Sequence, residues 1–320
     1  MWRRMLKILL YDVDSVIPNI ALMKISTYHK NLKNNVELIR GEGKPTEINY
    51  ANYDKGYASV VFTKHKDLVK DFPWNVGGTG FSLEKILPDY VEHLMPDYSL
   101  YPDNDYSIGF LTRGCCRNCS FCVVPIKEGM IRFNTSVHEF MNPDFKKIRI
   151  LDNNLLAYKD WEKCLIELKE TKKKIKFENF DFRLLTEKQA DLLSKINVEN
   201  NYIFALDHPK DIEYFSKKMW MVKKYFSEWR CKFYVLVGYN TTIKEDIQRV
   251  NFLLENKCLP YIMRHENYLK SENKNFYIDL AAWCNQVQFV KKMPFEEFLR
   301  RRYKNQERIN FSLKLWKENA

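Results

Sequence analysis

The feature that most constrains this chain is a cluster of cysteines at residues 115–122, called the cysteine loop below. The segment reads Leu111-Thr-Arg-Gly-Cys115-Cys-Arg-Asn-Cys119-Ser-Phe-Cys122-Val-Val-Pro125 and holds four of the eight cysteines in the sequence. We expect no secretory signal, so the thiols should stay reduced. Thiolates spaced this closely are then more typical of a soft-metal site than of disulfides.

The spacing narrows the choice of metal. Zinc sites usually combine two ligand pairs, and no second pair follows here, because the other cysteines stand singly in the sequence. Read as Cys115-x-x-x-Cys119-x-x-Cys122, the loop offers three thiolates to a cubane iron–sulfur cluster and leaves the fourth iron without a protein ligand. Cys116 permits a second spacing, C-x-x-C-x-x-C. An iron with an open position is a site for chemistry.

The loop and its flanks resemble the radical S-adenosylmethionine (radical SAM) superfamily. The resemblance rests on the C-x-x-x-C-x-F-C spacing, on the preceding Thr-Arg-Gly and on the following Val-Val-Pro. It implies that Cys115, Cys119 and Cys122 bind a [4Fe-4S] cluster, that Phe121 lies beside the adenine of SAM, and that Cys116 is not a ligand. It also implies an external one-electron reductant of the flavodoxin or ferredoxin kind, and cleavage of SAM to methionine and a 5′-deoxyadenosyl radical.

Composition indicates a globular chain without a membrane span. Of the 320 residues, 45% are hydrophobic and 29% are charged, and no apolar run approaches 18 residues. We therefore expect a cytoplasmic protein. The net charge of +11 is spread along the chain, with one dense patch at Arg300–Arg302, which makes nucleic acid a candidate partner beside the simpler reading of a solvated helix face.

Residues 1–100 are expected to form a small Rossmann-like α/β layer. The predicted strands are residues 6–12, 36–39 and 57–62; the predicted helices begin at Ile20 and at Leu83, the latter running to Leu87. A Gly77-Gly-Thr-Gly80 turn precedes the second helix. The layer looks similar to a shortened form of the cobalamin-binding domain found before many radical SAM cores. It lacks the D-x-H-x-x-G ligand motif, so cobalamin is possible but not favoured.

A turn-rich linker at 96–106 separates this layer from a regular alternation of strands and helices. We expect strands at residues 108–111, 148–152, 175–181, 202–207, 232–238 and 259–264. Capping boxes at Thr186 and Thr242 predict the starts of two of the helices. Six repeats imply a parallel (βα)6 partial TIM barrel at residues 105–290, which is the radical SAM core architecture, followed by a basic helical extension at 291–320.

Polar residues at the carboxyl ends of these strands are candidate SAM contacts. The resemblance places Asp152, Asn153 and Asn154 at the SAM ammonium group, where an Asx helix cap is the structural alternative. It places Arg183 near the SAM carboxylate, Asp207 at the ribose hydroxyls, and Gly238 where a side chain would obstruct the adenine. A further pair, His265 and Glu266, faces the expected barrel mouth, as substrate contacts or as a solvated loop.

These observations lead to one main hypothesis and two alternatives. The main hypothesis is a radical SAM enzyme that abstracts hydrogen from an unidentified substrate, with no catalytic residue assigned beyond the cofactor ligands. The first alternative is a cobalamin-dependent radical SAM methyltransferase. The second is a non-catalytic, zinc-stabilised nucleic-acid-binding protein.

Overall fold

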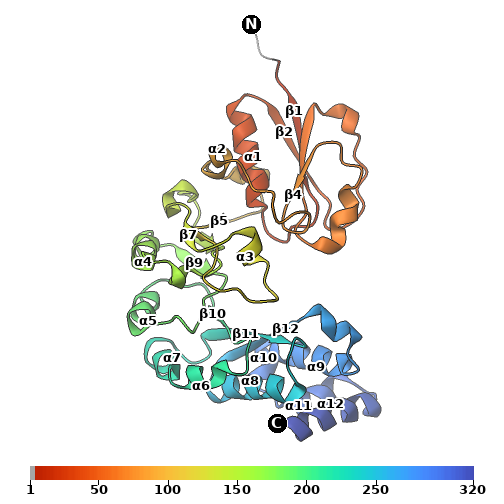
Figure 1. The fold of residues 1–320 in the computed structure, drawn as a ribbon, viewed down its shortest axis with the longest axis vertical. Helices are drawn as coiled ribbons and strands as arrows, with labels where there is room; N and C mark the ends of the chain where they lie inside the picture. Colours follow the sequence, from red (N-terminus) through yellow and green to blue (C-terminus); the bar gives the residue numbers. More distant parts are fainter. Residues whose placement is uncertain (1–3) are drawn as a thin grey trace. The chain divides into compact units, whose positions relative to one another are not determined.

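The structure, a computed structural model, describes residues 4–320. The chain divides into two compact units, Met1–Lys176 and Phe177–Ala320 (Figure 1). Both units are of the α/β class and contain parallel sheets, as the sequence predicts.

The first unit begins with a four-stranded sheet of order β2-β1-β3-β4 in which all neighbouring strands are parallel. Its strands are β1 (Lys7–Asp12), β2 (Asn35–Arg40), β3 (Lys55–Ser59) and β4 (Asn75–Gly77). Helix α1 (Ile20–Asn31) connects β1 to β2, and Asn19 caps its start by accepting a hydrogen bond from the Leu22 amide. The short 3-10 helices are η1 (Tyr50–Asn52), η2 (Thr63–Val69) and η3 (Tyr98–Leu100).

Strand β1 is buried on both faces because its side chains alternate between two cores. Ile8 and Leu10 pack with Leu22 of α1, whereas Leu9 and Tyr11 join a cluster with residues of 69–76. This explains why the strand reads as a continuous apolar run. Figure 1 shows α1 along one face of this sheet.

One predicted helix is wrong. Residues 83–87 form bends and coil, and the following helix α2 covers only Asp89–Glu92. The Ser82 hydroxyl accepts hydrogen bonds from the amides of Glu84 and Lys85, which holds the chain in a turn where the helix was expected.

The second sheet of the first unit has the order β5-β8-β9, with β5 (Tyr106–Gly109) parallel to β8 (Lys147–Ile150) and β9 (Lys174–Phe177) at its edge. Between β5 and β8 lie a short antiparallel pair, β6 (Thr112–Arg113) and β7 (Arg132–Phe133), and helix α3 (Val124–Lys127). The remaining elements are η4 (Val137–Glu139), η5 (Leu155–Ala157) and α4 (Trp161–Glu170).

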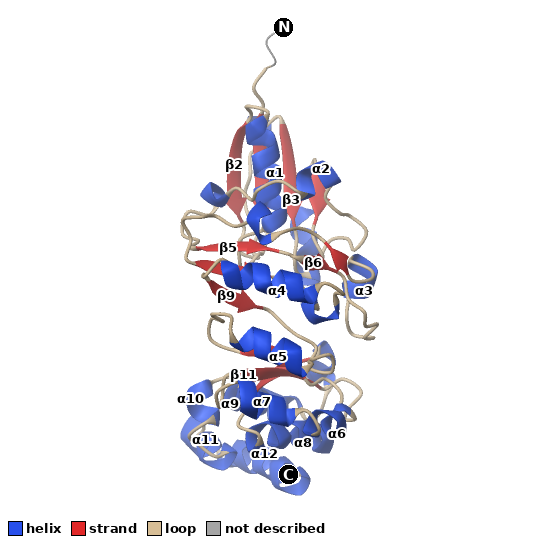
Figure 2. Cartoon of the chain, turned by 90° about the vertical axis from the view of Figure 1, so that its left-hand side faces the viewer, coloured by secondary structure: helices blue, strands red, loops and turns tan. Residues whose placement is uncertain are grey.

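The second unit contains the parallel sheet β10-β11-β12, made of Tyr202–Ala205, Cys231–Val237 and Leu259–Arg264. Figure 2 shows helices of this unit beside its sheet. They are α5 (Glu187–Ser194), α6 (Asp211–Ser216), α7 (Met219–Tyr225), α8 (Ile243–Glu255), η6 (Glu266–Lys270), α9 (Lys274–Cys284), α10 (Val287–Val290), α11 (Phe295–Arg302) and α12 (Gln306–Asn319). Phe180 also bridges to Phe204 of β10.

Both predicted capping boxes are present. The Thr186 hydroxyl accepts from the Gln189 amide while the Gln189 side chain accepts from the Thr186 amide, and Thr242 and Glu245 repeat the arrangement at the start of α8. The expected C-terminal helical extension is two helices, because the chain is extended at Tyr303, between α11 and α12.

A buried carboxylate ties α9 to the C-terminal segment. Asp279 is fully buried and accepts hydrogen bonds from the hydroxyls of Tyr303, at 2.6 Å, and Ser312, at 2.7 Å. The guanidinium of Arg308 lies 3.0 Å from the same carboxylate. The carboxylate therefore satisfies three polar groups that pack against α9.

We expect Asp279→Ala to lower the free energy of unfolding by about 3 kcal/mol, because two hydroxyls lose their acceptor and the largely buried Arg308 guanidinium is left with the Asn275 carbonyl. Urea unfolding followed by circular dichroism measures the change. Glu296→Ala is the matched control, since Glu296 pairs on the surface with Arg300 and Lys317, and its loss should cost no more than about 0.5 kcal/mol. Equal effects of the two substitutions would contradict this account.

Candidate functional site

The cysteine loop is closed at its base by the β6–β7 pair. Thr112 lies opposite Phe133 and Arg113 opposite Arg132. Beyond this pair the Cys115 amide donates to the Gly129 carbonyl at 3.1 Å, which continues the closure into the loop. The first cysteine is therefore held at the base of the loop.

Gly114 makes this close approach possible. Its φ is +86°, and a Cβ atom at this position would lie 2.4 Å from the Met130 carbonyl oxygen. Any L side chain would therefore be strained by the backbone conformation and would also clash with the opposite side of the loop. The glycine before Cys115 is a geometric requirement.

Asp152 joins the end of β8 to the start of the cysteine loop. Its carboxylate accepts hydrogen bonds at 2.7 Å from the amides of Leu111 and Thr112, and a further one from the Thr112 hydroxyl. The side chain is 4% exposed, and burial raises its pKa to about 7 even though these hydrogen bonds act in the opposite direction. Both carboxylate oxygens thus have partners within the first unit.

The sulfur of Cys115 receives two N–H groups. The Arg117 amide donates to Cys115 Sγ at 3.3 Å, and Asn154 Nδ2 donates to it at 3.4 Å. Asn154 Nδ2 also lies 3.8 Å from Sγ of Cys116. Two N–H donors therefore converge on the Cys115 sulfur.

Exposure separates the eight cysteines into two groups. Those of the loop are partly or fully exposed, whereas the four outside it are buried. Burial raises the pKa of the Cys164 and Cys258 thiols to about 12, and it raises the pKa of Cys231 and Cys284 well above the ordinary value. The isolated cysteines are therefore neutral core residues, and the accessible thiols gather in the loop.

The other predicted residues of this region differ in their surroundings. Asn154 is 2% exposed, and its Oδ1 atom is buried without a hydrogen-bond partner among the described residues. Asn153 is partly exposed, and Phe121 is 39% exposed on the loop. Within residues 4–320, no three side chains of His, Cys, Asp or Glu are arranged to hold a single metal ion.

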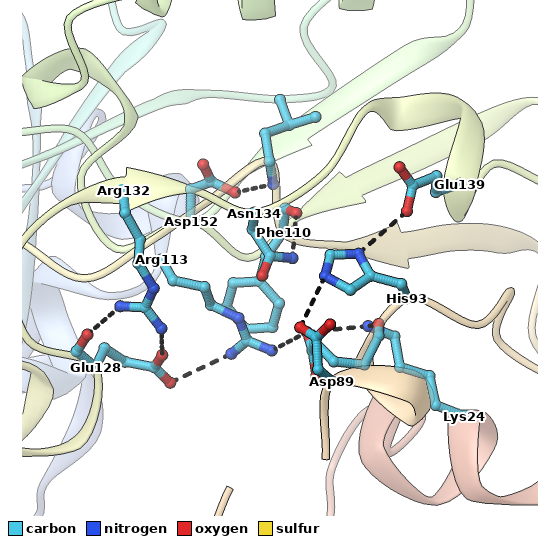
Figure 3. A network of polar contacts seen from close by, with 12 residues as sticks. Lys24, Asp89, His93, Phe110, Arg113, Glu128, Arg132, Asn134, Glu139 and Asp152 are labelled. Carbon is cyan, nitrogen blue, oxygen red and sulfur yellow. Dashed lines mark hydrogen bonds and ion pairs between the residues drawn. The ribbon is translucent and has the colours of Figure 1, made fainter. Parts of the chain in front are cut away.

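A network of charged side chains braces the loop against the N-terminal layer (Figure 3). Arg113 pairs with Glu92 of α2 at 2.8 Å and with Glu128, just after α3, at 3.2 Å. Its guanidinium also lies 3.7 Å from the centre of the Phe110 ring. Lys24 of α1 pairs with Glu92 at 3.0 Å, so the charges alternate in sign.

The pKa shifts in this network follow from burial and charge. Burial lowers the pKa of Lys24 and acts to raise that of Glu92. For Glu92 the neighbouring positive charges of Arg113 and Lys24 outweigh burial and hold the pKa below its usual value. Glu92 is thus a carboxylate that Arg113 and Lys24 share.

The remaining predicted SAM contacts lie in the second unit. Arg183 is ion-paired with Asp181 at 2.8 Å and with Asp211 at 3.5 Å. Asp207 follows β10, accepts a hydrogen bond from the Leu236 amide at 3.3 Å, and has its pKa raised to about 6, chiefly by burial. Gly238 has a φ of +72°, so this position favours glycine for its backbone as well as for the space beside Tyr268.

Two other predicted regions have local structural roles. His265 caps η6 by accepting a hydrogen bond from the Asn267 amide, and Glu266 is the first residue of that helix. Arg300–Arg302 form the exposed last turn of α11, where Arg300 pairs with Glu296 at 2.7 Å.

The Gly77–Gly80 segment is a packing element. Gly78 has a φ of +93°, and a Cβ atom there would lie 2.2 Å from the Val60 carbonyl oxygen. A Cβ atom at Gly80 would lie 2.6 Å from the backbone of Phe62. These glycines let two backbone segments of the same layer touch, so close packing accounts for both glycines.

The neighbouring end of the sheet is filled by the chain itself. Asp12 accepts from the Tyr101 hydroxyl at 2.8 Å, and Asn19 Nδ2 donates to the Ser59 hydroxyl at 2.8 Å. Asp14 accepts from the amides of Val61 and Phe62 and pairs with His65 at 2.9 Å. Parallel sheets often bind ligands at the carboxyl ends of their strands. In this sheet the polar groups at the carboxyl ends of β1 and β3 are hydrogen-bonded to one another instead.

Comparisons with known proteins give few matches. No family model matches this sequence, and no curated protein matches it. Among solved structures, Streptococcus suis SuiB bound to its precursor peptide SuiA aligns with 51% of this chain at 15% identity and a TM-score of 0.38. SuiB bound to S-adenosylmethionine aligns with 62% of this chain at 13% identity and a TM-score of 0.39. The alignments cover 40% and 45% of those chains.

A search of residues 4–320 for a helix with the length and apolar character needed to cross a membrane found none.

We expect Asp152→Asn to destabilise the first unit by about 2 kcal/mol, because an amide presents a donor where three donors already converge. Thermal unfolding measures the change, and loss of structure should begin around the cysteine loop in hydrogen exchange. Asp144→Asn is the matched control, because Asp144 is exposed, and its effect should stay within about 0.5 kcal/mol. An Asp152→Asn variant as stable as the wild type would show that the clamp contributes little.

Proposed function

We propose that this chain is a radical SAM enzyme whose cysteine loop holds a [4Fe-4S] cluster through Cys115, Cys119 and Cys122. The observation that carries the proposal is the Cys115 sulfur, which receives two N–H donors at the base of a loop that gathers the accessible thiols. Three thiolates in one loop suit a cubane with one open iron. The chemistry that such a cluster supplies when bound is one-electron reduction of SAM to methionine and a 5′-deoxyadenosyl radical.

The residues of the loop support the register that begins at Cys115. Its amide is fixed to Gly129, whereas Cys116 is exposed and lies farther from Asn154 Nδ2. We therefore propose Cys116 as a neighbour of the cluster and not as a ligand. Phe121, partly exposed on the same loop, remains our proposal for the residue beside the adenine.

For the SAM ammonium group we propose Asn154 as the main contact, with Asn153 beside it. Asn154 Oδ1 is a buried acceptor without a partner among the described residues, and an ammonium group is a donor that fits it. Asp152 then acts indirectly, because its oxygens already bind Leu111 and Thr112. The other SAM contacts remain proposals: Arg183 near the SAM carboxylate, Asp207 at the ribose hydroxyls, and Gly238 beside the adenine.

We propose further that residues 105–290 form the catalytic core and that the N-terminal layer supports the loop. The ion pairs between Arg113 and Glu92 and between Glu92 and Lys24 favour a supporting role. The substrate is unidentified, and the electron comes from an external flavodoxin-like or ferredoxin-like reductant. Hydrogen abstraction from that substrate is the reaction we propose.

The test of this proposal is metal content after anaerobic reconstitution with iron and sulfide. We expect about four irons per chain and a broad absorbance near 400 nm, and the dithionite-reduced protein should convert SAM to 5′-deoxyadenosine and methionine. Stoichiometric zinc without visible absorbance would instead support the zinc-stabilised nucleic-acid-binding alternative.

Three cysteine variants test the ligand set and its register. Cys119→Ala and Cys115→Ala should lose the cluster, whereas Cys116→Ala should retain its iron and its spectrum. Loss of iron in Cys116→Ala but not in Cys115→Ala would show that the ligand spacing begins one residue later.

We expect no tight binding of cobalamin to the N-terminal layer. Its glycines pack against Val60 and Phe62, and the polar groups at the carboxyl ends of β1 and β3 bind one another. Incubation with hydroxocobalamin followed by gel filtration should therefore leave no corrin absorbance with the protein. Stoichiometric corrin binding would make the cobalamin-dependent methyltransferase the better reading.

A further inference from the structure

Asn154 has a contact that the proposed SAM site does not use, the hydrogen bond from its amide nitrogen to a cysteine of the loop. It follows β8, is 2% exposed, and directs Nδ2 toward Cys115 Sγ at 3.4 Å. Its other amide atom, Oδ1, is buried and lacks a partner among the described residues. The Asn154 amide thus donates through Nδ2 to one of the proposed cluster ligands, and its Oδ1 atom is a buried acceptor.

We propose that Asn154 is a positioning residue that sets the reduction potential of the cluster through its hydrogen bond to Cys115 Sγ. This inference rests on the proposed function and deepens it, because it assigns the amide nitrogen a role in the electron-transfer step. That step adds one electron from the external reductant to the cluster and moves no proton.

The chemistry of the two groups fixes which amide atom faces the sulfur. A thiolate only accepts hydrogen bonds, so the nitrogen of the amide must face it and the oxygen must point away. Burial keeps water from competing with this hydrogen bond, which is therefore stronger than an exposed one. The orientation also leaves Oδ1 as the free acceptor.

The direction of the effect follows from charge. Reduction places one more negative charge on the cluster and its sulfur ligands, and a hydrogen-bond donor stabilises the more negative state more strongly. Asn154 therefore raises the reduction potential. The Arg117 amide acts in the same direction, and because it belongs to the backbone it persists when Asn154 is replaced.

The experiment is a redox titration, without SAM, of the reconstituted full-length protein and of three variants, followed by electron paramagnetic resonance of the reduced cluster. We expect Asn154→Ala to disfavour reduction roughly tenfold, which for a one-electron couple is about 59 mV toward negative potentials. Asn154→Asp should shift the potential further, because it adds a negative charge. Asp144→Asn, at an exposed position, is the control and should leave the potential unchanged.

The outcomes separate this inference from the proposed function. A wild-type protein that forms no cluster would overturn both. A wild-type cluster whose potential is unchanged in Asn154→Ala would overturn the inference alone.

If neither Asn154 variant keeps its cluster, the hydrogen bond is tested in the wild type, labelled with ¹⁵N at its asparagine side chains. Pulsed resonance of the reduced cluster should then show a nitrogen coupling from the amide that donates to Cys115 Sγ. Its absence would show that the amide does not reach the cluster ligand.

Discussion

The hydrogen bonds of the Asp152 carboxylate are the constraint on which the cysteine loop depends. Two backbone amides and a hydroxyl at Leu111 and Thr112 would be buried without partners if this carboxylate were absent. An unsatisfied buried donor costs about 1–3 kcal/mol, so the chain can leave β5 in this direction only with an acceptor in place. From that point the positive φ of Gly114 turns the backbone, and Cys115 is fixed by its amide. The position of the first thiol thus follows from a side chain 37 residues further along the sequence.

The charged network around Arg113 contributes more to the position of the cysteine loop than to the free energy of unfolding. Lys24, Glu92, Arg113 and Glu128 alternate in sign, so the group is close to neutral although it is largely buried. Buried ion pairs gain little over well-packed apolar residues, because desolvation offsets much of their attraction. These ion pairs instead fix the orientation of the side chains, because the planar guanidinium donates hydrogen bonds only in certain directions. In this chain the network fixes the loop relative to the layer formed by β1–β4.

Local sequence patterns predicted the elements whose cause is local. The reciprocal caps at Thr186 and Thr242 depend on residues within one helical turn, and the structure confirms them. The helix expected at 83–87 failed because the Ser82 hydroxyl captures nearby amides. The partners of Asp152 and Arg113 were not predictable from periodicity, because each contact joins segments far apart in the chain. The cysteine spacing was visible in the sequence, but the donors to Cys115 Sγ were not.

The choice of an amide beside Cys115 has a physical rationale. A lysine or arginine in this buried position would stabilise the thiolate more strongly, but it would carry an uncompensated charge that costs several kcal/mol to desolvate. If the loop holds the cluster proposed above, such a positive charge would also stabilise the reduced cluster so strongly that it would be a weak reductant. An amide orders the sulfur with a hydrogen bond of modest strength and adds no net charge, so the potential of the proposed cluster would stay low. The same side chain offers an oxygen that a cation can use, so one buried asparagine can serve both the thiolate and a positively charged ligand.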